Sequence, residues 1–71
     1  MQELEFKING EYIELIKLLK ATNIASSGGE AKILVESEVV LRNGEIETRK
    51  RAKITAGETI EVDGAVVVVT I

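Results

Sequence analysis

Two glycine-containing dipeptides, Asn43-Gly44 and Asp63-Gly64, constrain the fold of this chain more than any other feature. Asn-Gly and Asp-Gly favour the two-residue turns of β-hairpins, because both turn positions need a positive φ. Strands are predicted over 39–41 and 45–48 around the first dipeptide. Around the second, they are predicted over 59–62 and 65–71. The second half of the chain is therefore predicted to form antiparallel hairpins.

The first half of the chain begins with the pattern of a strand followed by a helix. Leu4, Phe6 and Ile8 alternate with charged residues, which predicts a short strand with one buried face. Apolar residues at helical spacing then predict an amphipathic helix over 11–22. Asn9 is predicted to cap this helix.

A second helix is predicted over 28–37. Ser27-Gly28-Gly29-Glu30 matches a capping box, in which the serine oxygen accepts a backbone hydrogen bond and the glutamate reaches back. Ala31, Leu34 and Val35 form the predicted inner face. The order of one strand, two helices and several strands predicts an α+β fold, with the two helices packed on a small antiparallel sheet.

Composition limits the chemistry that this chain could perform. Its 71 residues predict a single domain over 1–71. It has no cysteine and no histidine, so thiolate and ordinary zinc sites and a histidine-activated nucleophile are excluded. We therefore expect no cofactor, no metal and no enzymatic activity. The longest apolar run, Ala65–Val69, is too short to span a bilayer, and no export signal is visible, so a cytoplasmic protein without a membrane partner is expected.

A basic segment, Arg49–Lys53, stands out in a chain of formal net charge -3. Four of its five residues are basic, and no acidic residue occurs between Glu47 and Glu58. In an extended segment, Arg49, Arg51 and Lys53 would project from one face at intervals of roughly 6.6 Å, with Ala52 turned inward. Such a row of cations predicts contact with successive phosphates of a nucleic acid.

Two other features bear on a role in binding. The glycines between Ser26 and Lys32 could expose backbone N–H groups to an anion, but helix capping explains them better. The aromatics Phe6 and Tyr12 both fall on predicted core faces, so no surface for stacking bases is expected. RNA contact should then depend on charge and shape.

These patterns together resemble the S-four RNA-binding domain, which is named after the fourth protein of the small ribosomal subunit and is also called the αL motif. The likeness is greatest to small stand-alone bacterial members. The residues that carry it are Tyr12–Leu19, Ser27–Lys32, Val39–Leu41 with Asn43-Gly44, Arg49–Ile54 and Ala56–Ile60.

The resemblance implies an RNA partner, ribosomal or transfer RNA, bound at the second helix and the neighbouring loop and strand. By position it implies these RNA-binding residues: Ser27, Lys32, Arg42, Asn43, Arg49, Lys50, Arg51 and Lys53. Many members of the family have arginine after the serine, where this chain has Gly28. The second helix is therefore less basic, and more of the binding is expected to fall on Arg49–Lys53.

A protein-interaction module of a ribosomal or RNA-processing assembly is the alternative hypothesis. The run Val66–Val69 could form an exposed edge strand, which pairs readily with another chain. An acidic surface would suit a basic protein partner.

Overall fold

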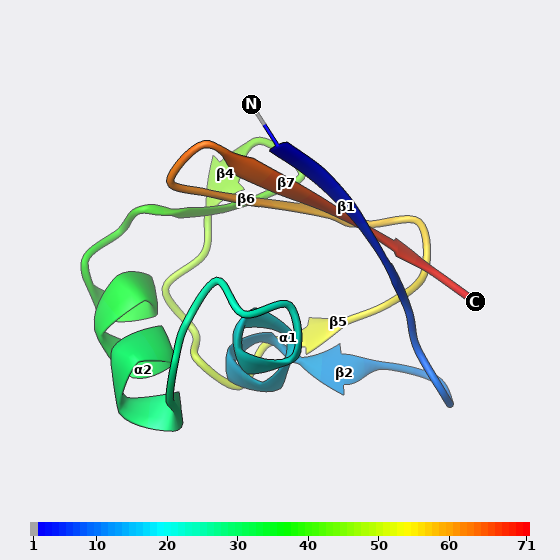
Figure 1. Cartoon of the computed structure of the whole chain (residues 1–71), viewed down its shortest axis with the longest axis horizontal. Coiled ribbons are helices and arrows are strands. Elements are labelled where there is room, and N and C mark those ends of the chain that lie inside the picture. Colours follow the sequence, from blue (N-terminus) through cyan, green and yellow to red (C-terminus); the bar gives the residue numbers. More distant parts are fainter. Residues whose placement is uncertain (1) are drawn as a thin grey trace.

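The chain folds into two layers, a five-stranded sheet and a helical layer that covers one face of it (Figure 1). The elements of the computed structural model, which describes residues 2–71, are β1 (Gln2–Lys7), β2 (Ile13–Glu14), α1 (Leu15–Ala21), α2 (Gly28–Glu36), β3 (Val40–Arg42), β4 (Glu45–Ile46), β5 (Lys53–Ile54), β6 (Thr59–Val62) and β7 (Ala65–Thr70). Strands β2 and β5 form a separate small sheet beside α1. The predicted α+β fold with two helices on a sheet is confirmed.

The five strands of the larger sheet lie in the order β1-β7-β6-β3-β4. Neighbouring strands are antiparallel except β1 and β7, which run parallel with Phe6 opposite Val69. This pair departs from the predicted antiparallel sheet, because the long segment between the two strands lets the chain return in the same direction. Strand β7 lies inside the sheet, with Val67 and Val69 fully buried. The predicted exposed edge strand at Val66–Val69 is therefore wrong.

Both predicted hairpin turns are confirmed. Asn43 and Gly44 have φ angles of 52° and 87°, and Asp63 and Gly64 have φ angles of 49° and 81°. Positive φ at both positions is the signature of the turn whose twist matches that of the flanking strands. The first turn joins β3 to β4 and the second joins β6 to β7.

The first helix is shorter than predicted, and its start differs. Ile13 and Glu14 pair with Ile54 and Lys53 as strand β2, so the helix begins at Leu15 and not near residue 11. Glu14 occupies the cap position, and the predicted cap at Asn9 is wrong. Main-chain pairing with a distant strand outweighs the helical pattern here.

The second helix matches its prediction closely. Ser27 Oγ accepts a hydrogen bond from the Glu30 N–H at 3.1 Å. The Glu30 carboxylate reaches back to Ser26, accepting from its N–H at 3.3 Å and its hydroxyl at 2.7 Å, one residue earlier than the capping box predicts. Ala31 and Val35 are fully buried, and Leu34 packs partly buried against them.

The core lies between the inner face of the sheet and the helices. Burial of each large aliphatic side chain there stabilises the fold by about 1.5–3 kcal/mol. The fully buried large side chains are Leu15, Leu18, Leu19, Val35, Val40, Ile54, Ile60, Val62, Val67 and Val69. Within residues 2–71, neither helix has the length and apolar character needed to cross a membrane.

Candidate nucleic-acid interface

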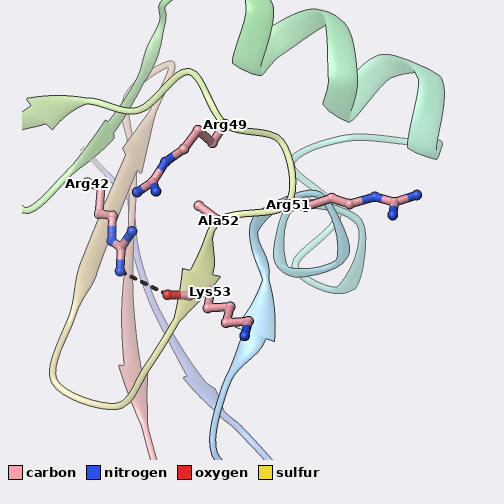
Figure 2. Close-up of a pocket in the computed structure, with 5 residues that line it drawn as sticks. All are labelled: Arg42, Arg49, Arg51, Ala52 and Lys53. Carbon is pink, nitrogen blue, oxygen red and sulfur yellow. Dashed lines mark hydrogen bonds between the residues drawn. The ribbon is translucent and has the colours of Figure 1, made fainter.

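The basic segment Arg49–Lys53 forms a turn, which we call the basic turn. The Ala52 N–H donates to the Arg49 carbonyl at 3.1 Å, and only Lys53 continues into β5. Figure 2 shows Arg49 extending toward Arg42 and Arg51 pointing away from both. The predicted row of cations along one extended strand is therefore wrong. The predicted burial of Ala52 and Ile54 is confirmed.

The basic turn binds the start of helix α1 through its backbone. The N–H of Leu15 donates to the Ala52 carbonyl at 3.0 Å, and the N–H of Ile16 donates to the Lys50 carbonyl at 3.1 Å. The first N–H groups of a helix have no partner within it, so carbonyls from elsewhere can satisfy them. This need explains why the segment turns here instead of remaining extended.

Arg42 holds the basic turn from its other side. Its guanidinium donates to both carboxylate oxygens of Glu58, from Nε at 2.7 Å and from Nη2 at 3.0 Å. It also donates to Glu47 Oε1 at 3.2 Å and to the Lys53 carbonyl at 2.9 Å, the bond drawn in Figure 2. Such charge-assisted, two-point hydrogen bonds are geometrically specific. One side chain thus ties β3 to β5 and to the residue before β6.

Arg49 is joined to the same cluster through Glu47. The Glu47 Oε2 atom accepts from the Arg49 backbone N–H at 3.0 Å and from its Nε at 3.1 Å. These bonds, with Arg42, lower the pKa of the nearly buried Glu47 to about 2. We call Arg42, Glu47, Arg49 and Glu58 the ion-pair cluster.

Glu58 is the second carboxylate of the cluster. Arg42, and then the backbone N–H and hydroxyl of Thr55, lower the pKa of Glu58 to about 2. The backbone bond from Thr55 measures 2.6 Å. Glu47 and Glu58 are the two acids that bound the acid-free stretch of the sequence. No spacing rule predicted this pairing, because Arg42 and Glu58 meet only through the sheet.

Asn43 is also held by internal hydrogen bonds. Its Oδ1 accepts from the Thr59 N–H at 2.9 Å, and its Nδ2 donates to Glu58 Oε1 at 3.2 Å. Of the eight residues implied by the resemblance, Arg42, Asn43 and Arg49 therefore have side chains that are held by hydrogen bonds within the fold.

Three cations of the basic turn remain outside the ion-pair cluster. Within residues 2–71, Lys50, Arg51 and Lys53 form no ion pair. Arg51 and Lys53 line a hollow of about 450 Å³ together with Arg42, Arg49 and Ala52 (Figure 2). The Lys53 ammonium lies 5.1 Å from the centre of the Tyr12 ring. Positive charge that no ion pair in the described part of the chain neutralises is what an incoming anion would meet at these three residues.

The residues implied on the second helix lie apart from this hollow. Lys32 is exposed on α2, and the Ser27 hydroxyl caps that helix. Helix α2 packs against α1, whose start the basic turn binds, so α1 connects the two groups of residues.

Several known proteins are similar to this chain. "Putative RNA-binding protein YbcJ" of Escherichia coli K12 is 43% identical over 53 residues, which are 75% of this chain and 76% of that protein. "Probable ribosome maturation protein RlbA" of Bacillus subtilis 168 is 35% identical over 57 residues, which are 80% of each chain.

A solved structure and a family model agree with these relatives. The solution structure of YbcJ, described as having an αL motif involved in RNA binding, aligns with a TM-score of 0.74 and 38% identity, over 94% of this chain and 86% of that one. The resemblance drawn from the sequence is thus confirmed. The model described as "S4 domain" matches residues 6–70, and the chain therefore belongs to the S4 domain family.

Proposed function

We propose that this protein binds structured RNA, without catalysis, through the basic turn. Its relatives support this proposal, since YbcJ is named as an RNA-binding protein and its structure is described in the same terms. The ribosome-maturation name of the Bacillus relative favours ribosomal RNA over transfer RNA as the partner. The protein would then work in the cytoplasm, where bacterial ribosomes are assembled.

One observation carries the proposal. The side chains of Lys50, Arg51 and Lys53 project from a turn whose backbone is hydrogen-bonded to the start of α1, and among the described residues they form no ion pair. Phosphates of an RNA backbone match such a group of cations. Lys32 would add a contact from the second helix. The ion-pair cluster, with Asn43, would hold the basic turn in place.

The side chains near the basic turn are suited to binding and not to catalysis. The chain has no histidine or cysteine to serve as base or nucleophile. The carboxylates of Glu47 and Glu58 have pKa values lowered to about 2 by their ion pairs. Each therefore stays ionised and engaged, and is poorly suited to proton transfer at neutral pH.

RNA titrations of a charge-neutralised variant test this proposal. The variant Lys50→Gln/Arg51→Gln should bind a structured RNA more weakly across sequences. Its plot of log affinity against log salt should be shallower by about 2 units, because two phosphate contacts are lost.

The matched control adds Glu3→Gln/Glu5→Gln on β1, which restores the parent's net charge at a distant site. If local charge binds RNA, the compensated variant stays weak. Parental affinity of either variant would contradict the proposed site.

A basic protein is a second candidate partner, and it would bind a different surface from the rejected edge strand. One row of facing residues crosses all five strands of the larger sheet. Its members are Glu3, Val66, Glu61, Leu41 and Ile46. No helix of the described chain covers this outer face (Figure 1). A row with two acidic and three apolar side chains complements a surface with cations and apolar groups.

This second candidate has its own test. Cross-linking after nuclease treatment should trap a basic protein on the parent chain and not on the variant Ile46→Lys/Glu61→Lys. That variant should keep its affinity for RNA. Equal trapping by parent and variant would reject the outer face as the interface.

A further inference from the structure

Tyr12 is the exposed aromatic residue of this chain. The sequence contains one tyrosine, one phenylalanine and no tryptophan. Phe6 packs against the core, whereas Tyr12 is 43% exposed. The prediction that both aromatics lie in the core is therefore wrong for Tyr12. Because α1 begins only at Leu15, Tyr12 lies outside this helix and is not on its inner face.

The position of Tyr12 is next to the cations of the basic turn. It directly precedes β2, in which Glu14 pairs with Lys53 of β5. Tyr12 is thus a diagonal neighbour of Lys53 across the two strands, a distance that long and aromatic side chains span. The Lys53 ammonium accordingly lies over the ring, 5.1 Å from its centre.

We infer that Tyr12 and Lys53 form a subsite for one unpaired nucleotide of the RNA, with the base stacked on the Tyr12 ring. This inference rests on the proposed function and adds a ligand class to it. Every nucleobase has a flat face that stacks on an aromatic ring, so the subsite would accept any of the four bases.

Lys53 does not close the subsite to a base. A cation over an aromatic ring at an exposed site is a weaker interaction than a base stacked on that ring. The exposed lysine side chain is flexible, so a base takes its place on the ring while the ammonium moves to the adjoining phosphate. The stacked base is a stronger contact than the one that is lost, and the ammonium keeps a favourable partner in the phosphate.

The subsite implies a preference among RNA shapes. In an uninterrupted duplex the bases are already stacked on one another, and only phosphates and riboses face the protein. A bulge or a single-stranded flank offers a free base beside a phosphate backbone. The protein should therefore favour a junction between paired and unpaired RNA, with Lys50 and Arg51 on the paired side.

Two RNAs that differ only in a bulge test this inference. The probes are a blunt-ended duplex and the same duplex with a short unpaired bulge. Tyr12→Ala should weaken binding to the bulged RNA by about 5- to 150-fold, with an unchanged salt slope, because stacking releases no counterions. Its affinity for the blunt duplex should stay within about twofold of the parent's.

Matched variants separate stacking from loss of structure. Tyr12→Phe keeps the ring and should bind both RNAs like the parent. Val39→Ala, which truncates another exposed apolar side chain (45% exposed), should also bind both like the parent. Equal losses on both RNAs, or parental affinity of Tyr12→Ala for the bulged RNA, would overturn the subsite.

The unaltered protein supplies a readout that does not depend on any variant. Because Tyr12 is the one tyrosine and tryptophan is absent, intrinsic tyrosine fluorescence, excited where phenylalanine does not absorb, reports this ring alone. The bulged RNA should quench it and the blunt duplex should not. Salt-dependent duplex binding with no difference in quenching would reject only the stacking subsite. If Lys50→Gln/Arg51→Gln binds RNA with the parent's affinity, the proposed function itself, RNA binding through the basic turn, is rejected instead.

Discussion

The Arg42 guanidinium and the Glu58 carboxylate meet in a two-point ion pair, with Nε 2.7 Å from Oε1 and Nη2 3.0 Å from Oε2. Arg42 is the last residue of β3, and Glu58 directly precedes β6. The ion pair therefore joins these two neighbouring strands at one end of their pairing. The same guanidinium binds Glu47 and the Lys53 carbonyl. Arg42 thus holds the basic turn on one side, and the backbone bonds to the start of α1 hold it on the other, without contacts among the exposed cations.

Replacing Arg42 by alanine should destabilise the fold strongly. The Arg42 side chain is 22% exposed, and its removal leaves the Glu58 carboxylate without its main partner in a partly buried place. We expect the free energy of unfolding in urea to fall by about 2–3 kcal/mol. Arg42→Lys should recover only part of this loss, because an ammonium does not make the two-point bond. Arg51→Ala, at an exposed cation without an ion pair, should stay within about 0.5 kcal/mol of the parent.

Acid should weaken the fold as the pH falls from about 4.5 to about 2. Ion pairing lowers the pKa values of Glu47 and Glu58 from 4.5 to about 2 in the folded chain. Both groups bind protons more weakly when folded than when unfolded, so their stabilisation is complete above pH 4.5 and is lost as the pH approaches 2. Urea titrations across this range measure the free energy of unfolding.

Two glutamine variants show whether these carboxylates cause the acid sensitivity. Glu58→Gln should be less stable than the parent at neutral pH and should lose less stability in acid, because one titrating group is gone. Glu36→Gln, at an exposed position on α2, should keep the parental dependence. An unchanged dependence in Glu58→Gln would contradict the assignment.

Ser27→Ala should lower stability through the loss of a helix cap. The Ser27 hydroxyl accepts from the Glu30 N–H at 3.1 Å, and its removal leaves that N–H without a partner at the start of α2. Thermal or urea unfolding should show a loss of about 1 kcal/mol, with a smaller loss in Ser27→Gly. Ser37→Ala, at the exposed C-terminal end of the same helix, is the control and should be near neutral. Equal effects at both serines would argue against the capping role.

Two neighbouring valines of β7 should respond very differently to truncation. Val67 is fully buried beneath the helices, whereas Val66 is half-buried on the outer face. Val67→Ala should reduce the free energy of unfolding by about 2–3 kcal/mol, and Val66→Ala by about 1 kcal/mol or less. Similar losses at both positions would contradict the placement of Val67 on the inner face and Val66 on the outer face of the sheet.

Several elements of this fold can be predicted from short stretches of the sequence. Asn43-Gly44 and Asp63-Gly64 predict their turns because positive φ is a property of the turn residues themselves. Ser27 predicts the start of α2 because a cap acts over three residues. Local chemistry was sufficient for each of these features.

Other features arise only where distant segments meet. Residues 13–14 follow the helical pattern locally, yet they pair with 53–54 as a strand, and this displaces Tyr12 to the surface beside Lys53. The parallel pairing of β1 with β7 and the ion pair of Arg42 with Glu58 likewise join parts of the chain that are remote in sequence.

The sequence alone therefore established the fold class, the family resemblance and the basic segment, because these depend on residue types and near-neighbour spacing. The tertiary structure alone decided which cations are engaged by carboxylates, which remain free, and which aromatic lies beside them. The physical reason is that ion pairs, strand pairing and exposure are contacts in space, and their energies depend on distances that no local pattern specifies.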